Sequence, residues 1–205
     1  MLAKKYQTQS SAIATYDYTD IAEGTGISAF YGGNASGSTA WILTGNTSLY
    51  SATGFTVLNG FDQNFDVPFN MPKSIKGELL LQVPISLYAD PTYSSTGYIV
   101  AKVVHYDGTT ETIIGGPVTS PSKTNGGSGA WGGAMLVLKM TIARKHFKKG
   151  DILRLNIVGT QSGTGTDQGV IGHSPIGTQS TSSGEGFAGL GTSRISMFVP
   201  FELDL

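Results

Sequence analysis

Histidine, serine and carboxylate side chains are the groups in this sequence whose chemistry suits catalysis. The three histidines are His105, His146 and His173, and no His-Glu-x-x-His motif sets two of them at metal-ligand spacing. His105 lies on the side of an expected strand, and we expect it to be a polar surface residue. His173 lies next to Ser174 and near Asp167, so a Ser-His-Asp arrangement can be drawn there. No Gly-x-Ser-x-Gly elbow accompanies it, and a polar loop offers such combinations by chance. We therefore predict no catalytic residue and no metal site.

The carboxylates form no pair suited to glycoside hydrolysis. Asp62 and Asp66 share the polar side of one expected strand, which separates them by about 13 Å at the rise of a β-strand. A glycosidase needs two carboxylates about 5–10 Å apart. Gly184-x-Gly186-x-x-Gly189 matches a dinucleotide fingerprint formally, but no strand-helix unit frames it. The sequence accordingly predicts a protein that is not an enzyme and binds no cofactor.

A basic cluster is the one concentration of charge in the chain. Its side chains would meet an acidic neighbour or a phosphate, or they would lie in solvent on a turn between strands. Charge runs usually mark a solvated surface, so we favour the turn. The cluster consists of Arg144, Lys145, His146, Lys148 and Lys149.

Alternation of apolar and polar residues predicts the elements that must position these groups. Six segments show the period of two that is typical of half-buried strands, and no segment carries a convincing helical stripe. The chain of 205 residues has 29 Gly, no Cys and 13% charged residues, a composition that favours strands and turns over helices. We predict an all-β fold, an antiparallel β-sandwich with jelly-roll topology. The six segments are 61–69, 79–87, 98–106, 134–142, 153–157 and 195–205.

Two local signals refine this pattern. Asp107-Gly108 lies between two alternating runs and predicts a hairpin turn. Pro84 interrupts its strand, and because proline has no N–H to donate, it predicts a sheet edge or a bulge at that position. Weaker strands are expected near 26–31, 40–43, 55–58 and 110–114.

A resemblance supports the jelly-roll prediction. In the segment 142–157, a strand is followed by a short turn ending Phe147-x-x-Gly150-Asp151 and by a second alternating strand. This arrangement resembles the jelly-roll domains of viral capsid and fibre proteins. The resemblance implies that Phe147 plugs the end of the core, that Gly150 supplies the turn and that Asp151 bonds the backbone there.

Two further segments resemble proteins of tailed bacteriophages. One is 18–26 together with Phe30-Tyr31-Gly32-Gly33, and the other is 65–77. These resemblances imply a virion protein, and they imply no particular chemistry.

The domain organisation is predicted as an extended N-terminal arm, 1–25, followed by a single sandwich domain, 26–205. Two long Gly/Ser/Thr-rich loops, 115–133 and 160–194, are expected outside the sheets. The arm has too few apolar residues for a core of its own, so we expect it to cross onto another subunit. The predicted interface residues are Leu2, Tyr6, Ile13, Tyr16, Tyr18, Ile21 and Trp131.

The predicted function is that of a structural bacteriophage protein, a capsid decoration (cement) protein or a minor capsid protein. Its partners would be other copies of itself, with a trimer as the favoured homo-oligomer, and a major capsid protein or other virion proteins. The net charge of −1 argues against nucleic acid as a partner. No stretch approaches the roughly 18 apolar residues of a membrane span, and no signal peptide follows Met1, so we expect synthesis in the host cytoplasm and residence in the virion.

A carbohydrate- or receptor-binding module of a phage tail fibre is the alternative. Exposed aromatic rings stack on sugars, and the candidates for this role are Tyr31, Tyr50, Tyr93 and Trp131. Trp131, which lies among glycines, would serve sugar stacking, an intersubunit contact or the closing of the sandwich end. A polysaccharide hydrolase comes last because no acid pair supports it.

Overall fold

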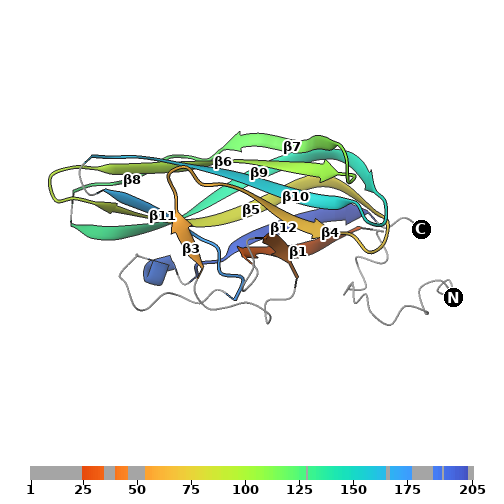
Figure 1. Ribbon diagram of the computed structural model, residues 1–205, viewed down its shortest axis with the longest axis horizontal. Helices are drawn as coiled ribbons and strands as arrows, with labels where there is room; N and C mark the ends of the chain where they lie inside the picture. The colour runs from red at the N-terminus through yellow and green to blue at the C-terminus, as the bar shows by residue number, and fades with distance from the viewer. Residues whose placement is uncertain are drawn as a thin grey trace.

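The computed structural model describes residues 25–34, 40–45, 54–127, 129–164, 167–176, 187–190 and 192–202. This part of the chain is built from β-strands, and its one helical element is a short 3-10 turn, η2 (Phe187–Leu190). The long strands run along the long axis of the molecule, so the turns between them gather at its two ends (Figure 1). The predicted arm lies almost entirely outside the described residues, and the domain boundary at 25 stays a prediction.

Four nested antiparallel pairs define the topology. The first strand, β1 (Thr25–Asn34), pairs with the last, β12 (Ile195–Glu202), and β4 (Asp62–Pro68) pairs with β10 (Ile152–Ser162). Inside them, β5 (Lys73–Ala89) pairs with β9 (Ala130–Phe147), and β6 (Ser95–Tyr106) pairs with β7 (Glu111–Thr119). This nesting is the wrapping of a jelly roll, as the alternation predicted.

The strands form two layers. One is ordered β9-β5-β12-β1, and the other is ordered β4-β10-β6-β7. Short strands extend these layers: β2 (Trp41–Thr44) links β1 to β4, β3 (Phe55–Val57) pairs with β11 (Gln168–Gly172), and β8 (Lys123–Asn125) pairs with β6. Parts of both predicted loops are thus strands, because β8 and β11 add to sheet edges.

The core fills the space between the layers. Alternate residues of β5 and β10 point inward, and Leu79, Leu81, Leu153 and Leu155 are fully buried. Period-two alternation of this kind buries one side of each strand and leaves the other outside. The sequence pattern therefore placed the core correctly.

The turn between β9 and β10 closes one end of that core. Phe147 is fully buried, and Gly150 adopts a φ of +93° that favours glycine. The Asp151 carboxylate accepts a hydrogen bond of 2.8 Å from the Lys148 N–H, which confirms the role predicted for it. The same carboxylate lies 2.6 Å from His105 Nε2, so His105 is buried and not the surface residue its strand position suggested.

Pro84 lies in the middle of β5, at neither an edge strand nor a bulge. One side of β5 pairs with β12 as far as Gln82 and with β11 from Ile85 onward. Pro84 sits between these two partners, where the strand makes no ladder bond on that side. A residue without an N–H therefore fits there at little cost.

Candidate functional site

The sequence-predicted interface residues divide into two groups. Trp131 is described: it is half-buried at the start of β9, and its ring lies 5.7 Å from that of Tyr88, its cross-strand partner on β5. The two rings are tilted by 53° to each other, and the pair covers one end of the sheet. The six arm residues, from Leu2 to Ile21, lie outside the described residues.

An apolar surface on the β9-β5-β12-β1 layer is the candidate functional site. On the outer side of this layer, apolar residues occupy positions where a solvated sheet face carries polar ones. Ile27 is 70% exposed and Val137 is 47% exposed, and the other members are half-buried. We call this surface the apolar face; it consists of Ile27, Ala29, Leu80, Val137, Phe198 and Pro200.

Strand register makes these residues a continuous surface. Ala29 pairs with Phe198, and Phe198 pairs with Leu80, so the three form a row across β1, β12 and β5. Ile27 pairs with Pro200 in the next row. Directly paired side chains lie about 5 Å apart, within contact distance. On β9 the surface becomes mixed, because Lys139 pairs with Leu80, whereas Val137 pairs with Gln82 and lies diagonal to Leu80.

Sequence reasoning missed the apolar face, although a signal was present. The alternation in 195–205 was read from Met197, Val199 and Phe201, which point inward and are buried. Phe198 and Pro200 occupy the positions between them and break the polar side of the pattern. An apolar residue on the polar side of a strand is the sequence mark of a second contact surface.

The outer side of the β4-β10-β6-β7 layer carries a group of polar side chains that are paired with one another. The Arg154 guanidinium donates to both carboxylate oxygens of Asp66 at 2.7 Å, and it also contacts the Glu111 carboxylate. These hydrogen bonds raise the pKa of Arg154, and the bond to Asp66 has the largest effect. The Asn156 amide donates to Asp62 and Asn64, at 2.9 Å each. We call Asp62, Asn64, Asp66, Glu111, Arg154 and Asn156 the polar face.

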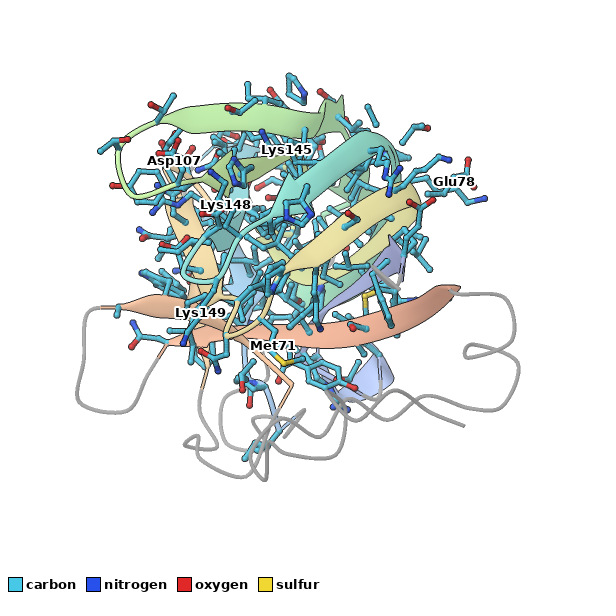
Figure 2. All side chains as sticks on the ribbon, turned by 90° about the vertical axis from the view of Figure 1, so that its right-hand side faces the viewer. Met71, Glu78, Asp107, Lys145, Lys148 and Lys149 are labelled. Atoms are coloured by element: carbon cyan, nitrogen blue, oxygen red, sulfur yellow. The ribbon has the colours of Figure 1, made fainter. Side chains whose placement is uncertain are left out.

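The basic cluster lies at one end of the sandwich. Lys145, Lys148 and Lys149 gather there with the turn that contains Asp107 (Figure 2). Arg144 Nε lies 3.1 Å from Glu202, the residue that pairs with Thr25 at the start of β1. The chain therefore enters its first strand beside this lysine-rich end.

The turn at the lysine-rich end has the predicted hairpin geometry. Asp107 Oδ1 accepts hydrogen bonds from the N–H groups of Thr110 and Thr109, and these lower the pKa of Asp107 to about 2. Gly108 has a φ of +97°, which explains the glycine.

The candidate catalytic groups are directed to other partners. Asp167 accepts hydrogen bonds from the N–H groups of Asp90 and Thr164, whereas His173 Nε2 lies 2.8 Å from Thr56 Oγ1. Burial lowers the pKa of His173 to about 4. Asp62 and Asp66 bind side chains of β10, as described above.

In the ranges given above, no group of three His, Cys, Asp or Glu side chains is placed to hold a metal ion. The described part of the chain also has no helix long and apolar enough to cross a membrane.

Comparison with known proteins gives similarity in structure only. No protein-family model matches the sequence, and no curated protein matches it. Two crystal structures of a CocE/NonD family hydrolase from Staphylococcus aureus are similar, at 9% and 8% identity with TM-scores of 0.47 and 0.45. They match 87% and 86% of this chain, which spans 37% of the hydrolase chain.

Two further structures come from unrelated proteins. Eiger TNF from S. frugiperda is 13% identical with a TM-score of 0.29, and the match covers 86% of this chain and 92% of that one. The infectious bursal disease virus Gx strain structure is 10% identical with a TM-score of 0.29, covering 87% and 37%.

The hydrolase structures contradict the prediction that this chain is not an enzyme, and that prediction is wrong as stated. It rested on missing motifs, and a β-sandwich is compatible with chemistries that carry no local sequence signature. At this level of similarity the match assigns neither a catalytic residue nor a substrate to this chain.

Proposed function

We propose that the chain is a structural protein of a bacteriophage virion, a capsid decoration or minor capsid protein that acts through contacts between subunits. The apolar face carries this proposal. Burying apolar surface contributes about 25 cal/mol per Å², and an isolated subunit leaves this surface in water. The resemblance of 18–26 and 65–77 to tailed-phage proteins supports the virion as the place of assembly.

The occupant of the apolar face is a second copy of this chain. Only 13% of residues are charged, so few ions need desolvation when two copies approach. Ile27 is 70% exposed and pairs with Pro200, one row from Ala29 and Phe198, and a contiguous exposed apolar patch marks a contact surface. The polar face already satisfies its own charges and offers less to a partner.

Replacing Ile27 by lysine tests the proposal without removing a core residue. We expect Ile27→Lys to fold normally and to lose self-association, as measured by analytical ultracentrifugation. Ile113→Lys is the matched control, because Ile113 is 53% exposed and lies on β7 in the other layer. It should associate like the unaltered protein.

A capsid-binding assay tests whether the surface that mediates self-association also binds the virion. Capsids assembled without this protein should bind the unaltered chain and Ile113→Lys, and should bind Ile27→Lys weakly. Equal association and equal capsid binding by both lysine variants would contradict the proposal.

A second candidate function, saccharide binding by a tail-fibre module, is favoured by a separate observation. Tyr93 is 50% exposed at the end of the sandwich opposite the basic cluster. Of the other aromatic candidates, Tyr31 lies under the Arg194 guanidinium at 4.5 Å, and Tyr50 lies outside the described residues.

A further inference from the structure

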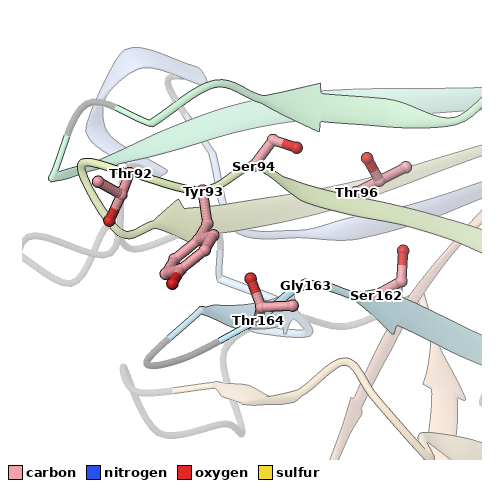
Figure 3. A pocket seen from close by; sticks show the side chains of 7 residues that line it. All are labelled: Thr92, Tyr93, Ser94, Thr96, Ser162, Gly163 and Thr164. Carbon is pink, nitrogen blue, oxygen red and sulfur yellow. The ribbon is translucent and has the colours of Figure 1, made fainter.

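An open groove lies at the end of the sandwich where β5 turns into β6. It has a volume of about 730 Å³. One wall is the β5–β6 turn and the start of β6, and the other is the end of β10 (Figure 3). We call it the hydroxyl groove; it is lined by Thr92, Tyr93, Ser94, Thr96, Ser162, Gly163 and Thr164.

The lining has an unusual composition for a surface depression. Five of the seven lining residues carry an aliphatic hydroxyl, one is glycine and one is tyrosine, and none carries a charge. The Tyr93 ring extends from the turn toward Thr164 on the opposite wall (Figure 3). A half-exposed aromatic ring in a groove lined with hydroxyl groups offers an apolar surface and hydrogen-bonding groups to the same ligand.

Asp167 holds the two walls in a common frame. One of its carboxylate oxygens accepts the Asp90 N–H at 2.7 Å, and the other accepts the Thr164 N–H at 2.9 Å. Asp90 in turn binds Thr92 through the backbone N–H at 3.1 Å and the hydroxyl at 2.7 Å. The half-buried Asp167 carboxylate thus fixes the β5–β6 turn relative to the end of β10.

Contacts at the base of the groove also hold its two walls in place. A Cβ at Gly163 would come within 2.5 Å of Asp167 Oδ2, so the chain passes close to the carboxylate only because this residue is glycine. Thr96 pairs with Ser162 across β6 and β10, and its hydroxyl lies 2.9 Å from that of Thr124 on β8. The groove is therefore built on paired strands, which reduces the ordering needed on binding.

We propose that the hydroxyl groove binds a neutral saccharide, with the Tyr93 ring stacked on the C–H side of one sugar ring. A sugar ring has C–H groups on one face and hydroxyls around its rim, which matches an exposed aromatic ring surrounded by hydroxyls. An anionic ligand would find no counter-charge among the lining residues. This inference deepens the second candidate function and does not depend on the apolar face.

Saturation-transfer NMR and calorimetry with named sugars test the site. The neutral probes are maltotriose, lactose and triacetylchitotriose, and sialyllactose is the anionic comparison. We expect at least one neutral probe to bind, with its C–H protons receiving the saturation. Tyr93→Ala should weaken that binding by about 10-fold, as expected for the loss of one stacking ring. Tyr93→Phe, which keeps the ring, should retain most of it.

Two further variants separate this site from the other proposals. Ile27→Lys should bind the neutral probe like the unaltered chain, whether or not it self-associates. Asp167→Ala should weaken binding, and Asp167→Asn, which keeps one acceptor oxygen, should restore part of it. A lost thermal transition in Asp167→Ala would leave the test to Asp167→Asn and Tyr93→Ala.

Three results would overturn the inference. They are the absence of neutral-probe binding at millimolar concentration, unchanged binding by Tyr93→Ala, and binding of sialyllactose alone.

Discussion

The two outer faces of the sandwich use the same strand geometry for opposite purposes. On the polar face, Arg154 is bound by Asp66 and Glu111, so its charges are satisfied within the chain. On the apolar face, Ile27 and Val137 remain exposed. Because both faces are the outward half of alternating strands, periodicity alone does not distinguish them.

The difference separates stability from association. Groups that are paired within the subunit contribute to its own free energy of unfolding, and their removal leaves partners unsatisfied. Exposed apolar groups contribute little to the isolated subunit, and their burial drives contact with another molecule. Mutations on the polar face should therefore change the free energy of unfolding, and mutations on the apolar face should change association. Core mutations give the reference for the size of the stability effect.

The largest loss of stability is expected from a core residue beneath the polar face. Leu155 points into the core from β10, next to the outward-facing Arg154, and is fully buried. Leu155→Ala should lower the free energy of unfolding by about 2–5 kcal/mol. Urea denaturation followed by fluorescence measures it, and an unchanged midpoint would contradict the register of β10.

The second effect is a loss of stability in acid. Burial lowers the pKa of His173 from 6.5 to about 4, so the folded state resists protonation. Stability from this group is present in full above pH 6.5. As the pH falls from about 6.5 to 4, the unfolded chain takes up a proton that the folded chain does not, which costs up to about 3 kcal/mol.

Urea denaturation between pH 7 and pH 4 measures this loss. His173→Gln should flatten the curve over that interval, because glutamine does not titrate. A curve of equal slope in both proteins would show that carboxylates, such as those of the polar face, carry the acid sensitivity instead.

The third effect tests the polar face itself. Arg154→Ala leaves the Asp66 and Glu111 carboxylates without their shared partner and should cost about 1–3 kcal/mol. Arg154→Lys keeps the charge without the two-pronged geometry and should recover part of the loss. Self-association should be unaffected, and a change in sedimentation would mean that the polar face also contacts a partner.

The smallest effect on stability is expected from the arm. Removing residues 1–24 keeps β1, which begins at Thr25, and should leave the free energy of unfolding within about 0.5 kcal/mol of the original. Capsid binding should weaken if the arm crosses onto a neighbour. Undiminished binding would assign the contact to the apolar face alone.

The prediction of fold from sequence succeeded where the signal was local. Strand alternation located Leu79 and Leu155 in the core, and the Phe147, Gly150 and Asp151 pattern identified the turn that closes it. These features depend on residues that are neighbours along the chain, or on a period of two, so the sequence contains them directly.

Features that join distant segments could not be read in the same way. His105 looks like a surface residue until β6 is placed beside the turn that carries Asp151. Pro84 looks like an edge residue until β11 and β12 are seen to meet beside it. In both positions the partner comes from a segment far away in the chain.

The sequence by itself determined the long strands, the jelly-roll class and the closing turn, because side-chain periodicity and turn chemistry act over a few residues. Only the tertiary structure decided the two proposed contact surfaces. Ile27 and Phe198 join one surface because β1 pairs with β12, and Tyr93 faces Thr164 because Asp167 ties the two segments together. Such surfaces depend on strand order and register, which follow from the packing of the whole chain.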